Sequence, residues 1–371
     1  MNVPFYDMRP ANEACRSQIE AAMARVMDKS WYILGEELET FEQAYAQYCG
    51  AAHCIGVNSG TDALWLALLA AGVGPGDEVV TVAHTFVATA ISIIKTGAIP
   101  IFADVDLETL LMDPRSVKDR ITDSTKVILP VHLYGRCADL SPIMELGAQH
   151  GIVVIEDACQ AHGAQFQGRC AGTFGIAGCF SFYPTKNLGA LGDGGGIVTD
   201  DPIFAASLRK LRNYGEAEKY HHDSLGYNSR LDEIQSAVLR EKLVMLDDWN
   251  RERARLSQLY RDRLCGISEV RLLTDADHPQ HVYHLFVVRI VGVVSRETVQ
   301  QRLTKAGIGT SCHYPVPTHF QNPFTDQDVP PGSLPVTEQV ASEVLSLPLF
   351  PGMRDSIVEV VCEALSGAVT P

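Results

Sequence analysis

One lysine stands in an unusual setting for a charged side chain. Lys186 lies in the stretch SFYPTKNLGALGDGG (residues 181–195), between a short apolar run and a series of glycines. A lysine that serves only the structure usually keeps its ammonium group in water at the end of a flexible stem. Lys186 instead follows a segment with the composition of a buried strand, in a turn rich in proline and glycine. This setting favours a lysine that is used for the chemistry of its nitrogen.

A carboxylate and an amide follow another apolar run. Asp157 ends the run GIVVIED (residues 151–157), and Gln160 comes shortly after it. Removing a carboxylate from water at a strand end costs free energy unless a cation or hydrogen-bond donors compensate it. Asp157 is therefore a candidate site residue, although N-capping of a helix in the segment that follows would explain it equally well.

A third candidate is the turn at Ser59, Gly60 and Thr61, which joins a strand-like run to a helical one. Free backbone N–H groups, two hydroxyls and the positive end of a helix dipole suit such a turn to a phosphate group. Plain N-capping by either hydroxyl is the alternative. Phe86 follows the next apolar run. Its ring could cover a flat ligand, although a phenylalanine in such a position more often packs in the core.

Together these residues match the needs of one cofactor. Pyridoxal 5'-phosphate requires an amine for a Schiff base, a carboxylate for its pyridine nitrogen, a phosphate site and an aromatic face. The amine would come from Lys186 and the carboxylate from Asp157. The turn at residues 59–61 would form the phosphate site, and Phe86 would provide the aromatic face. Two glycine-rich stretches, GVGPGDE and GTFGIAG, lack the spacing of a dinucleotide-binding motif, which disfavours a nicotinamide enzyme. The sequence also has no histidine, cysteine or carboxylate cluster with metal-site spacing.

The elements that would position these residues form an alternating pattern. Between residues 50 and 200, runs rich in β-branched residues alternate with segments of helical spacing that end on Gly72 and Gly151. Five of the runs are predicted strands: residues 53–57, 77–82, 98–105, 125–131 and 151–157. The alternation predicts an α/β fold, with a mostly parallel sheet that helices cover on both faces. Ligands bind such sheets at the carboxyl ends of the strands.

The pattern changes near residue 250. A long, charged helical segment covers residues 231–264. Four further elements are predicted after it: a strand within 281–292, a helix near 295–307, a proline-containing loop at 313–324 and a last helix near the C-terminus. We predict a large cofactor-binding domain over residues 1–250 and a smaller C-terminal α/β domain over residues 251–371.

The composition excludes several classes of partner. The 371 residues include 30 basic and 45 acidic ones, and the net charge of -15 opposes unspecific binding to nucleic acid or to an anionic membrane. No apolar run approaches the roughly 20 residues of a membrane-spanning helix, and the first residues lack the pattern of a signal peptide. The ten cysteines are scattered without a C-x-x-C pair, which favours free thiols in a reducing compartment. We expect a cytoplasmic protein without nucleic-acid or membrane partners.

The sequence as a whole resembles a known family, the sugar aminotransferases of the DegT/DnrJ/EryC1 group, which have the type I fold of aspartate aminotransferase. The segments that carry the resemblance follow the family order along nearly the whole chain: YILGEELETFEQAYAQYCG, NSGTDAL, PGDEVVTVAHTFVATA, VHLYG, IEDACQAHGA, FSFYPTKNLGALGDGG and GYNSRLDEIQSAVLREKL. Some relatives have a histidine in place of the lysine and dehydrate their sugars. Lys186 therefore points to transamination.

The resemblance implies a role for each candidate residue. Lys186 would form the Schiff base with pyridoxal phosphate, Asp157 would pair with the pyridine nitrogen, and Gln160 would contact the phenolic oxygen. Phe86 would stack on the ring. The phosphate would be bound by Ser59, Gly60, Thr61 and Ser181, together with Asn228 from the other subunit of a homodimer with shared active sites.

The resemblance also implies a reaction. L-glutamate would donate its amino group, by way of pyridoxamine 5'-phosphate, to a nucleotide-linked keto sugar. The stretch YPTKNLGALGDGG is most similar to enzymes that aminate C3 of dTDP-3-keto-6-deoxyhexoses. Enzymes that act at C4 and those that make aminocyclitols are close alternatives.

Three more residues are candidates for substrate binding. Arg230 has the planar donor group that suits a diphosphate, and Tyr314 and His319 lie on the proline-containing loop, which could reach the hexose. A solvated arginine and a plain surface loop are the alternatives. A Schiff-base aldolase, a PLP-dependent dehydratase and a non-catalytic regulatory protein of the same fold are the other functions that these residues allow.

Overall fold

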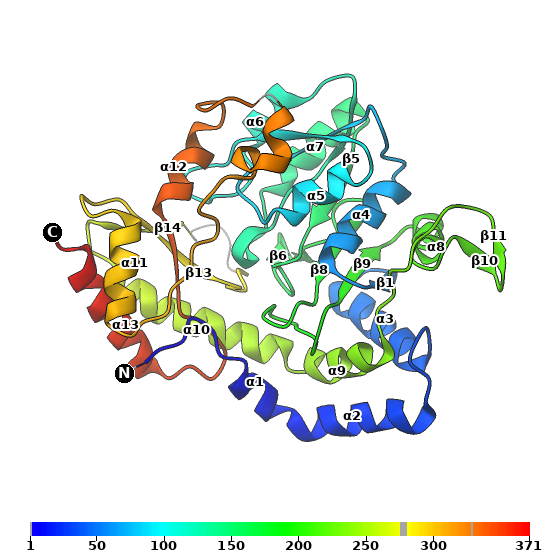
Figure 1. Cartoon of the computed structure of the whole chain (residues 1–371), viewed down its shortest axis with the longest axis horizontal. Helices are drawn as coiled ribbons and strands as arrows, with labels where there is room; N and C mark the ends of the chain where they lie inside the picture. The colour runs from blue at the N-terminus through cyan, green and yellow to red at the C-terminus, as the bar shows by residue number, and fades with distance from the viewer. Residues whose placement is uncertain (1, 275–279, 328) are drawn as a thin grey trace.

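The centre of the structure is a seven-stranded sheet (Figure 1). The computed structural model describes residues 2–274, 280–327 and 329–371. In spatial order the strands are β1 (His53–Val57), β9 (Gly195–Thr199), β8 (Ala177–Ser181), β5 (Val153–Asp157), β4 (Thr125–Ile128), β2 (Glu78–Val82) and β3 (Ile99–Ala103). Neighbouring strands from β8 to β3 pair in parallel, whereas β9 is antiparallel to both β1 and β8. The prediction of a mostly parallel sheet is confirmed.

Helices cover both faces of this sheet, as the prediction required. Alternate side chains of a strand point to opposite faces, and the core divides in the same way. Phe180 and Val198 pack with α3 (Glu36–Cys49) on one face, while Cys179 and Ile197 pack with α4 (Gly60–Ala70) on the other. The other helices of this part of the chain are α1 (Arg9–Ala14), α2 (Arg16–Lys29), α5 (Ala88–Ile94), α6 (Pro114–Arg120), α7 (Leu140–His150), α8 (Pro202–Leu211) and α9 (Glu233–Leu243).

The antiparallel strand β9 returns the chain across one edge of the sheet. β8 ends at Ser181 and β9 begins at Gly195. Residues 182–194 therefore form a loop at the edge where β1, β2 and β5 also end. The loop is tight: a Cβ atom at Gly189 would lie 2.2 Å from the carbonyl oxygen of Pro184, so only glycine fits there. This loop carries Lys186 to the carboxyl ends of the strands.

The C-terminal part of the chain builds a second sheet with its own core. Its strands are β12 (Val270–Leu272), β13 (Phe286–Ile290) and β14 (Val344–Leu347), and their pairing is antiparallel. Three helices pack around its core: α10 (Leu246–Leu264), α11 (Arg296–Lys305) and α13 (Asp355–Val369). The shorter α12 (Pro335–Glu343) precedes β14. The strand predicted within residues 281–292 is β13, the helix predicted near residues 295–307 is α11, and the predicted last helix is α13, so these three elements are confirmed. The domain division at residue 250 stays a prediction.

The segment 231–264 is not one continuous helix. α9 ends at Leu243 and α10 begins at Leu246. α9 packs against α2 and α3, whereas α10 packs against α13. The helical hydrogen bonding is therefore interrupted between a helix that packs beside the large sheet and one that packs on the core of the small sheet, and periodicity alone does not reveal this break. Asp247 and Asp248 in the first turn of α10 favour a new helix start, because acidic side chains stabilise a helix N-terminus.

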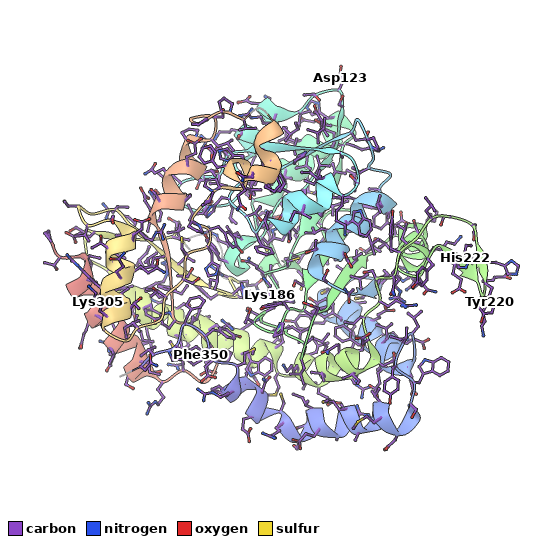
Figure 2. All side chains as sticks on the ribbon, in the orientation of Figure 1. Asp123, Lys186, Tyr220, His222, Lys305 and Phe350 are labelled. Carbon is purple, nitrogen blue, oxygen red and sulfur yellow. The ribbon has the colours of Figure 1, made fainter. Side chains whose placement is uncertain are left out.

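Two short hairpins complete the fold. β6 (Gln165–Phe166) pairs with β7 (Arg169–Cys170), and β10 (Glu216–Glu218) pairs with β11 (His221–His222). The second hairpin projects from the body of the protein, with Tyr220 and His222 at its far end (Figure 2). All ten cysteines are free thiols. Among the described residues, no helix combines the length and the apolar character needed to cross a membrane.

Candidate active site

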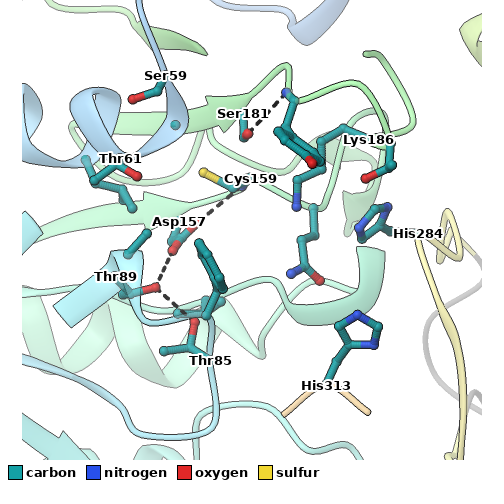
Figure 3. A pocket seen from close by; sticks show the side chains of 18 of the residues that line it. Ser59, Thr61, Thr85, Thr89, Asp157, Cys159, Ser181, Lys186, His284 and His313 are labelled. Carbon is teal, nitrogen blue, oxygen red and sulfur yellow. Dashed lines mark hydrogen bonds between the residues drawn. The ribbon is translucent and has the colours of Figure 1, made fainter. Parts of the chain in front are cut away.

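A pocket of 530 Å³ opens at the carboxyl ends of the central strands (Figure 3). It brings together residues from the turns after β1 and β2, from the ends of β5 and β8, and from the loop before β9. The sequence-predicted residues that line it are Ser59, Gly60, Thr61, Phe86, Asp157, Gln160, Ser181, Lys186 and Tyr314. The parallel sheet thus gathers side chains that lie far apart in the sequence.

Lys186 reaches into this pocket from the loop between β8 and β9. Its backbone N–H donates to the carbonyl oxygen of Tyr183 at 2.8 Å, which fixes the turn that carries it. Burial lowers the pKa of the Lys186 amine below its ordinary value, and the nearby Cys159 and Asp157 oppose this effect. A larger fraction of the amine is therefore neutral near neutral pH, as a nucleophile or a general base requires.

Asp157 lies at the end of β5 with 4% of its surface exposed. Its Oδ2 accepts a hydrogen bond from Thr89 Oγ1 at 2.8 Å, and its Oδ1 accepts one from the Cys159 backbone N–H at 3.2 Å. The residues that follow Asp157 form turns and not a helix, so helix capping does not explain this carboxylate. Donors on two sides hold it in place at the pocket wall (Figure 3).

The amide of Gln160 has a defined orientation. Its Oε1 accepts a hydrogen bond from the Tyr134 backbone N–H at 2.8 Å, and its Nε2 donates to the Tyr314 hydroxyl at 3.2 Å. Burial raises the pKa of Tyr314, so that its hydroxyl keeps its proton. Because this oxygen already accepts from Gln160, its hydrogen remains available for a group in the pocket.

The turn before α4 forms the opposite side of the pocket. Ser59 is the N-cap of α4, and its Oγ accepts a hydrogen bond from the Asp62 backbone N–H at 3.1 Å. A Cβ atom at Gly60 would lie 2.6 Å from Ser181 Cβ, so glycine is needed where α4 approaches β8. The helix start, with its free N–H groups, therefore faces the pocket next to the hydroxyls of Ser59, Thr61 and Ser181.

Phe86 is not a core residue. Its side chain is 53% exposed and lines the pocket, with its ring centre 5.8 Å from that of Tyr314. The core-packing alternative for Phe86 is therefore wrong. The two rings form an aromatic wall at the mouth of the pocket.

Three sequence-predicted residues do not line this pocket in the described structure of the single chain. Asn228 is exposed, and Arg230 donates from Nη1 to Asn213 Oδ1 at 3.0 Å. His319 is 2% exposed and lies beside the rings of Phe102 and Phe320. The expectation that His319 reaches the hexose does not fit this position. The loop pattern missed a short helical turn at Thr318–Phe320 that turns His319 inward.

Two histidines at the pocket were not among the sequence-predicted residues. Asn187 donates from Nδ2 to Asn250 Oδ1 and to the Val282 carbonyl, so its Oδ1 faces His284 Nδ1 at 3.2 Å. An amide oxygen only accepts, and His284 therefore carries its hydrogen on Nδ1 and leaves the lone pair of Nε2 free. Burial lowers the pKa of His284, and it lowers that of His313 to about 4. His284 lies in the run at residues 281–292, for which the sequence predicted a strand and no site residue.

The residues of the pocket fit pyridoxal phosphate. An amine with a lowered pKa and a buried, oriented carboxylate lie in the same pocket. The Gln160 amide nitrogen has a second hydrogen besides the one that it donates to Tyr314. The start of α4, where only glycine fits at the first position, supplies free N–H groups. No group of three or more histidine, cysteine or carboxylate side chains suited to a metal ion occurs in the part of the chain that the structure describes.

Comparisons with known proteins agree with this fit. The chain is 46% identical over 369 residues to the erythromycin biosynthesis sensory transduction protein EryC1 of Saccharopolyspora erythraea, covering 99% of this chain and 100% of that one. It is also 46% identical over 352 residues to the dTDP-3-amino-3,4,6-trideoxy-alpha-D-glucose transaminase of Streptomyces venezuelae, covering 95% and 92% of the two chains. Its structure matches the crystal structure of DesV from S. venezuelae with a TM-score of 0.97 and 44% identity, over 100% and 99% of the chains.

The family comparison covers nearly the whole sequence. Residues 13–366 match the DegT/DnrJ/EryC1/StrS aminotransferase family. This range includes both sheets and every residue of the pocket. The resemblance inferred from the sequence motifs is confirmed, and the chain belongs to the DegT/DnrJ/EryC1/StrS aminotransferase family.

Proposed function

We propose that the protein transfers an amino group from L-glutamate to C3 of a dTDP-linked 3-keto-6-deoxyhexose, with pyridoxal phosphate as its cofactor. The observation that carries this proposal is the pocket in which Lys186 and Asp157 meet the glycine-containing start of α4. The choice of substrate is supported by the similarity to a transaminase whose name specifies a 3-amino dTDP-sugar. Amination at C4 and amination of a cyclitol are not favoured by any of the relatives described above.

Each residue of the pocket would contact a different part of the cofactor. Lys186 would bind it covalently, Asp157 would hold a proton on the pyridine nitrogen, and the N–H of Gln160 would face the phenolic oxygen. Ser181 and the turn at residues 59–61 would bind the phosphate, and Phe86 would cover the ring. When bound, pyridoxal phosphate supplies an electron-accepting ring and an aldehyde that takes up an amino group and passes it on.

Lys186 would also act as the proton carrier of the reaction. Its lowered pKa makes the free amine a proton acceptor near neutral pH, and the flexible stem allows the proton to be delivered to a second atom in the same pocket. Tyr314, with its hydrogen free to donate, would orient a sugar oxygen. The polar side chains thus hold and orient both substrates, while the rings of Phe86 and Tyr314 shield the pocket mouth.

A mass-balance assay tests the proposed reaction. The purified protein, with L-glutamate and a dTDP-3-keto-6-deoxyhexose, is expected to form one 2-oxoglutarate for each amino sugar, since transamination conserves the amino group. Liquid chromatography with mass spectrometry measures both products. Sugar turnover without glutamate consumption would indicate a dehydratase or an aldolase. The absence of any turnover, with the cofactor bound, would favour a regulatory protein.

We further propose a cytoplasmic homodimer whose two active sites are shared. The ten free thiols suit a reducing compartment. Asn228 and Arg230 lie outside the pocket of their own chain, yet they are firmly held, since Asn228 forms a β-bridge with Asn213 and Arg230 bonds to the same residue. A two-fold axis would bring two such segments to two equivalent sites. Asn228 would then contact the partner's phosphate, and Arg230 the diphosphate of the sugar nucleotide.

Subunit complementation tests the shared site. Lys186→Ala and Asn228→Ala chains are each expected to be nearly inactive, because each dimer lacks one required group in both sites. When the two chains are mixed under conditions of subunit exchange, heterodimers should regain activity, since one of their two sites contains both residues. Mixing each variant with itself is the control. Lack of recovery despite exchange and two severe single defects would place Asn228 in the site of its own chain.

A further inference from the structure

The hydroxyl of Ser229 touches both ends of the turn at residues 59–61. Its Oγ donates to Asp62 Oδ2 at 2.8 Å and accepts a hydrogen bond from the Asn58 backbone N–H at 3.2 Å. Asn58 immediately precedes the turn and Asp62 immediately follows it. Because a hydroxyl donates and accepts at the same time, one side chain holds both ends of the turn. An alanine could do neither.

Asp62 connects Ser229 to the pocket, because it also contacts the pocket residue Ser59. Its backbone N–H donates to Ser59 Oγ at 3.1 Å, which leaves the hydroxyl hydrogen of Ser59 free for a ligand. Its Oδ1 lies 3.5 Å from Lys95 Nζ, and that ammonium group lies 3.6 Å from the ring centre of Trp65. The Asp62 carboxylate is therefore held by Ser229 on one side and by a cation on the other. This pairing also offsets part of the repulsion between the carboxylate and a phosphate.

Ser229 is itself fixed by contacts that do not involve the pocket. It is 1% exposed, and its backbone N–H donates to the Arg212 carbonyl at 2.9 Å. Two residues earlier, the Tyr227 N–H donates to the Leu211 carbonyl at 2.7 Å, and the Tyr227 ring centre lies 4.1 Å from that of Trp65. The segment is thus docked on the end of α8 and on α4. The position of Ser229 is set by the fold and does not depend on a ligand.

We propose that Ser229 is a positioning residue for the phosphate of the cofactor: it holds the turn at residues 59–61 in its binding shape from outside the pocket. This inference rests on the proposed cofactor site. Ser229 does not line the pocket, so it acts only through Asn58 and Asp62. Ser229 also adjoins Asn228, which we propose to reach the active site of the partner subunit. The Ser229 hydroxyl therefore links the segment that carries Asn228 to the turn at residues 59–61 of the same chain.

Two ligands that differ by the phosphate alone test this role. In apoenzyme titrations, Ser229→Ala is expected to weaken the binding of pyridoxal phosphate by about ten- to fiftyfold, the effect of lost hydrogen bonds to charged or buried groups. Pyridoxal, which has no phosphate, should bind to the variant and to the wild type within about twofold. At saturating pyridoxal phosphate the turnover number should return close to that of the wild type, because no group that reacts has been removed.

Ser236→Ala is the matched control. Its hydroxyl is also buried, and it donates to the carbonyl of Asp232, the N-cap residue of α9, without contacting the turn. This substitution should leave both affinities unchanged. Ser229→Cys, which keeps nearly the same size but forms much weaker hydrogen bonds, should repeat the selective loss of pyridoxal phosphate affinity with less disturbance of the buried site.

The outcomes separate this inference from the proposed function. Equal binding of pyridoxal phosphate by the wild type and both Ser229 variants would overturn the positioning role and leave the proposed function standing. An equal loss of both ligands in both variants would also overturn it, since the effect would then be general damage to the fold. A wild-type protein that binds no pyridoxal phosphate would overturn the proposed function and this inference with it.

Discussion

Replacement of Lys186 by alanine is expected to reduce the rate of amino transfer by more than about a thousandfold, because general acid–base catalysis by a positioned group alone contributes up to about 10⁴. The variant loses both the covalent link to the cofactor and the amine that moves the proton. It should still bind the cofactor non-covalently, since Asp157, Ser181 and the turn at residues 59–61 remain. Steady-state rates and the absorption spectrum of the dialysed protein measure the two effects.

Two further variants make this test specific. Lys186→Arg keeps the positive charge, but a guanidinium group stays protonated at neutral pH, so this variant should be as inactive as Lys186→Ala. Lys305→Ala removes an exposed lysine at the end of α11, far from the pocket (Figure 2), and should behave like the wild type. A rate close to that of the wild type in either Lys186 variant would remove the lysine from the reaction.

Replacement of Asp157 by asparagine is expected to lower the rate by about a hundredfold or more, while the fold is kept. The amide oxygen can still accept the hydrogen bond from Thr89 or from the Cys159 backbone, so the local structure should survive. An amide cannot hold a proton on the pyridine nitrogen as a carboxylate does, and the ring then accepts electrons less well. The turnover number and the thermal midpoint, measured together, distinguish these effects.

The neighbouring carboxylate provides the contrasting case. Glu156 is completely buried on the other face of β5, where it contacts His132 Nε2 and accepts hydrogen bonds from the backbone N–H groups of Gly172, Phe174 and Gly175. Glu156→Gln should therefore lower the free energy of unfolding by about 2–4 kcal/mol, through lost charge-assisted bonds, with little change in the turnover number of the folded protein. If Asp157→Asn instead lowered only the stability, Asp157 would be a structural residue.

Five strands of the large sheet and the cofactor residues could be predicted from the sequence, because their signals are local, whereas the antiparallel strand β9 was not predicted. Lys186, Asp157 and the turn at residues 59–61 each follow a short apolar run, and a parallel sheet gathers such strand ends at one edge. The break at Val244 and Met245 could not be predicted, since helical spacing continues through it. The folded structure alone shows that α9 packs against α2 and α3, whereas α10 packs against α13.

The remaining site residues depend on contacts between distant parts of the chain. His284 reaches the pocket because Asn187 and Asn250 fix its ring, and Ser229 matters only because its segment docks on α4. His319 shows the converse. Its loop looks like a surface loop in the sequence, but the ring of Phe102 provides an apolar neighbour that draws the side chain inward. No periodicity or motif encodes these pairings.

The most direct test of the active site is to locate the lysine that carries the cofactor. The wild-type protein is incubated with pyridoxal phosphate, reduced with borohydride and digested, and the modified peptide is identified by mass spectrometry. We expect one modified residue for each chain, Lys186. The competing amine is that of Lys242 in α9, because burial also lowers its pKa. Its Nζ donates to the carbonyl of Gly189, which lies in the loop that carries Lys186, at 2.8 Å. Modification of Lys242 or of any other lysine, with Lys186 unmodified, would contradict the assignment.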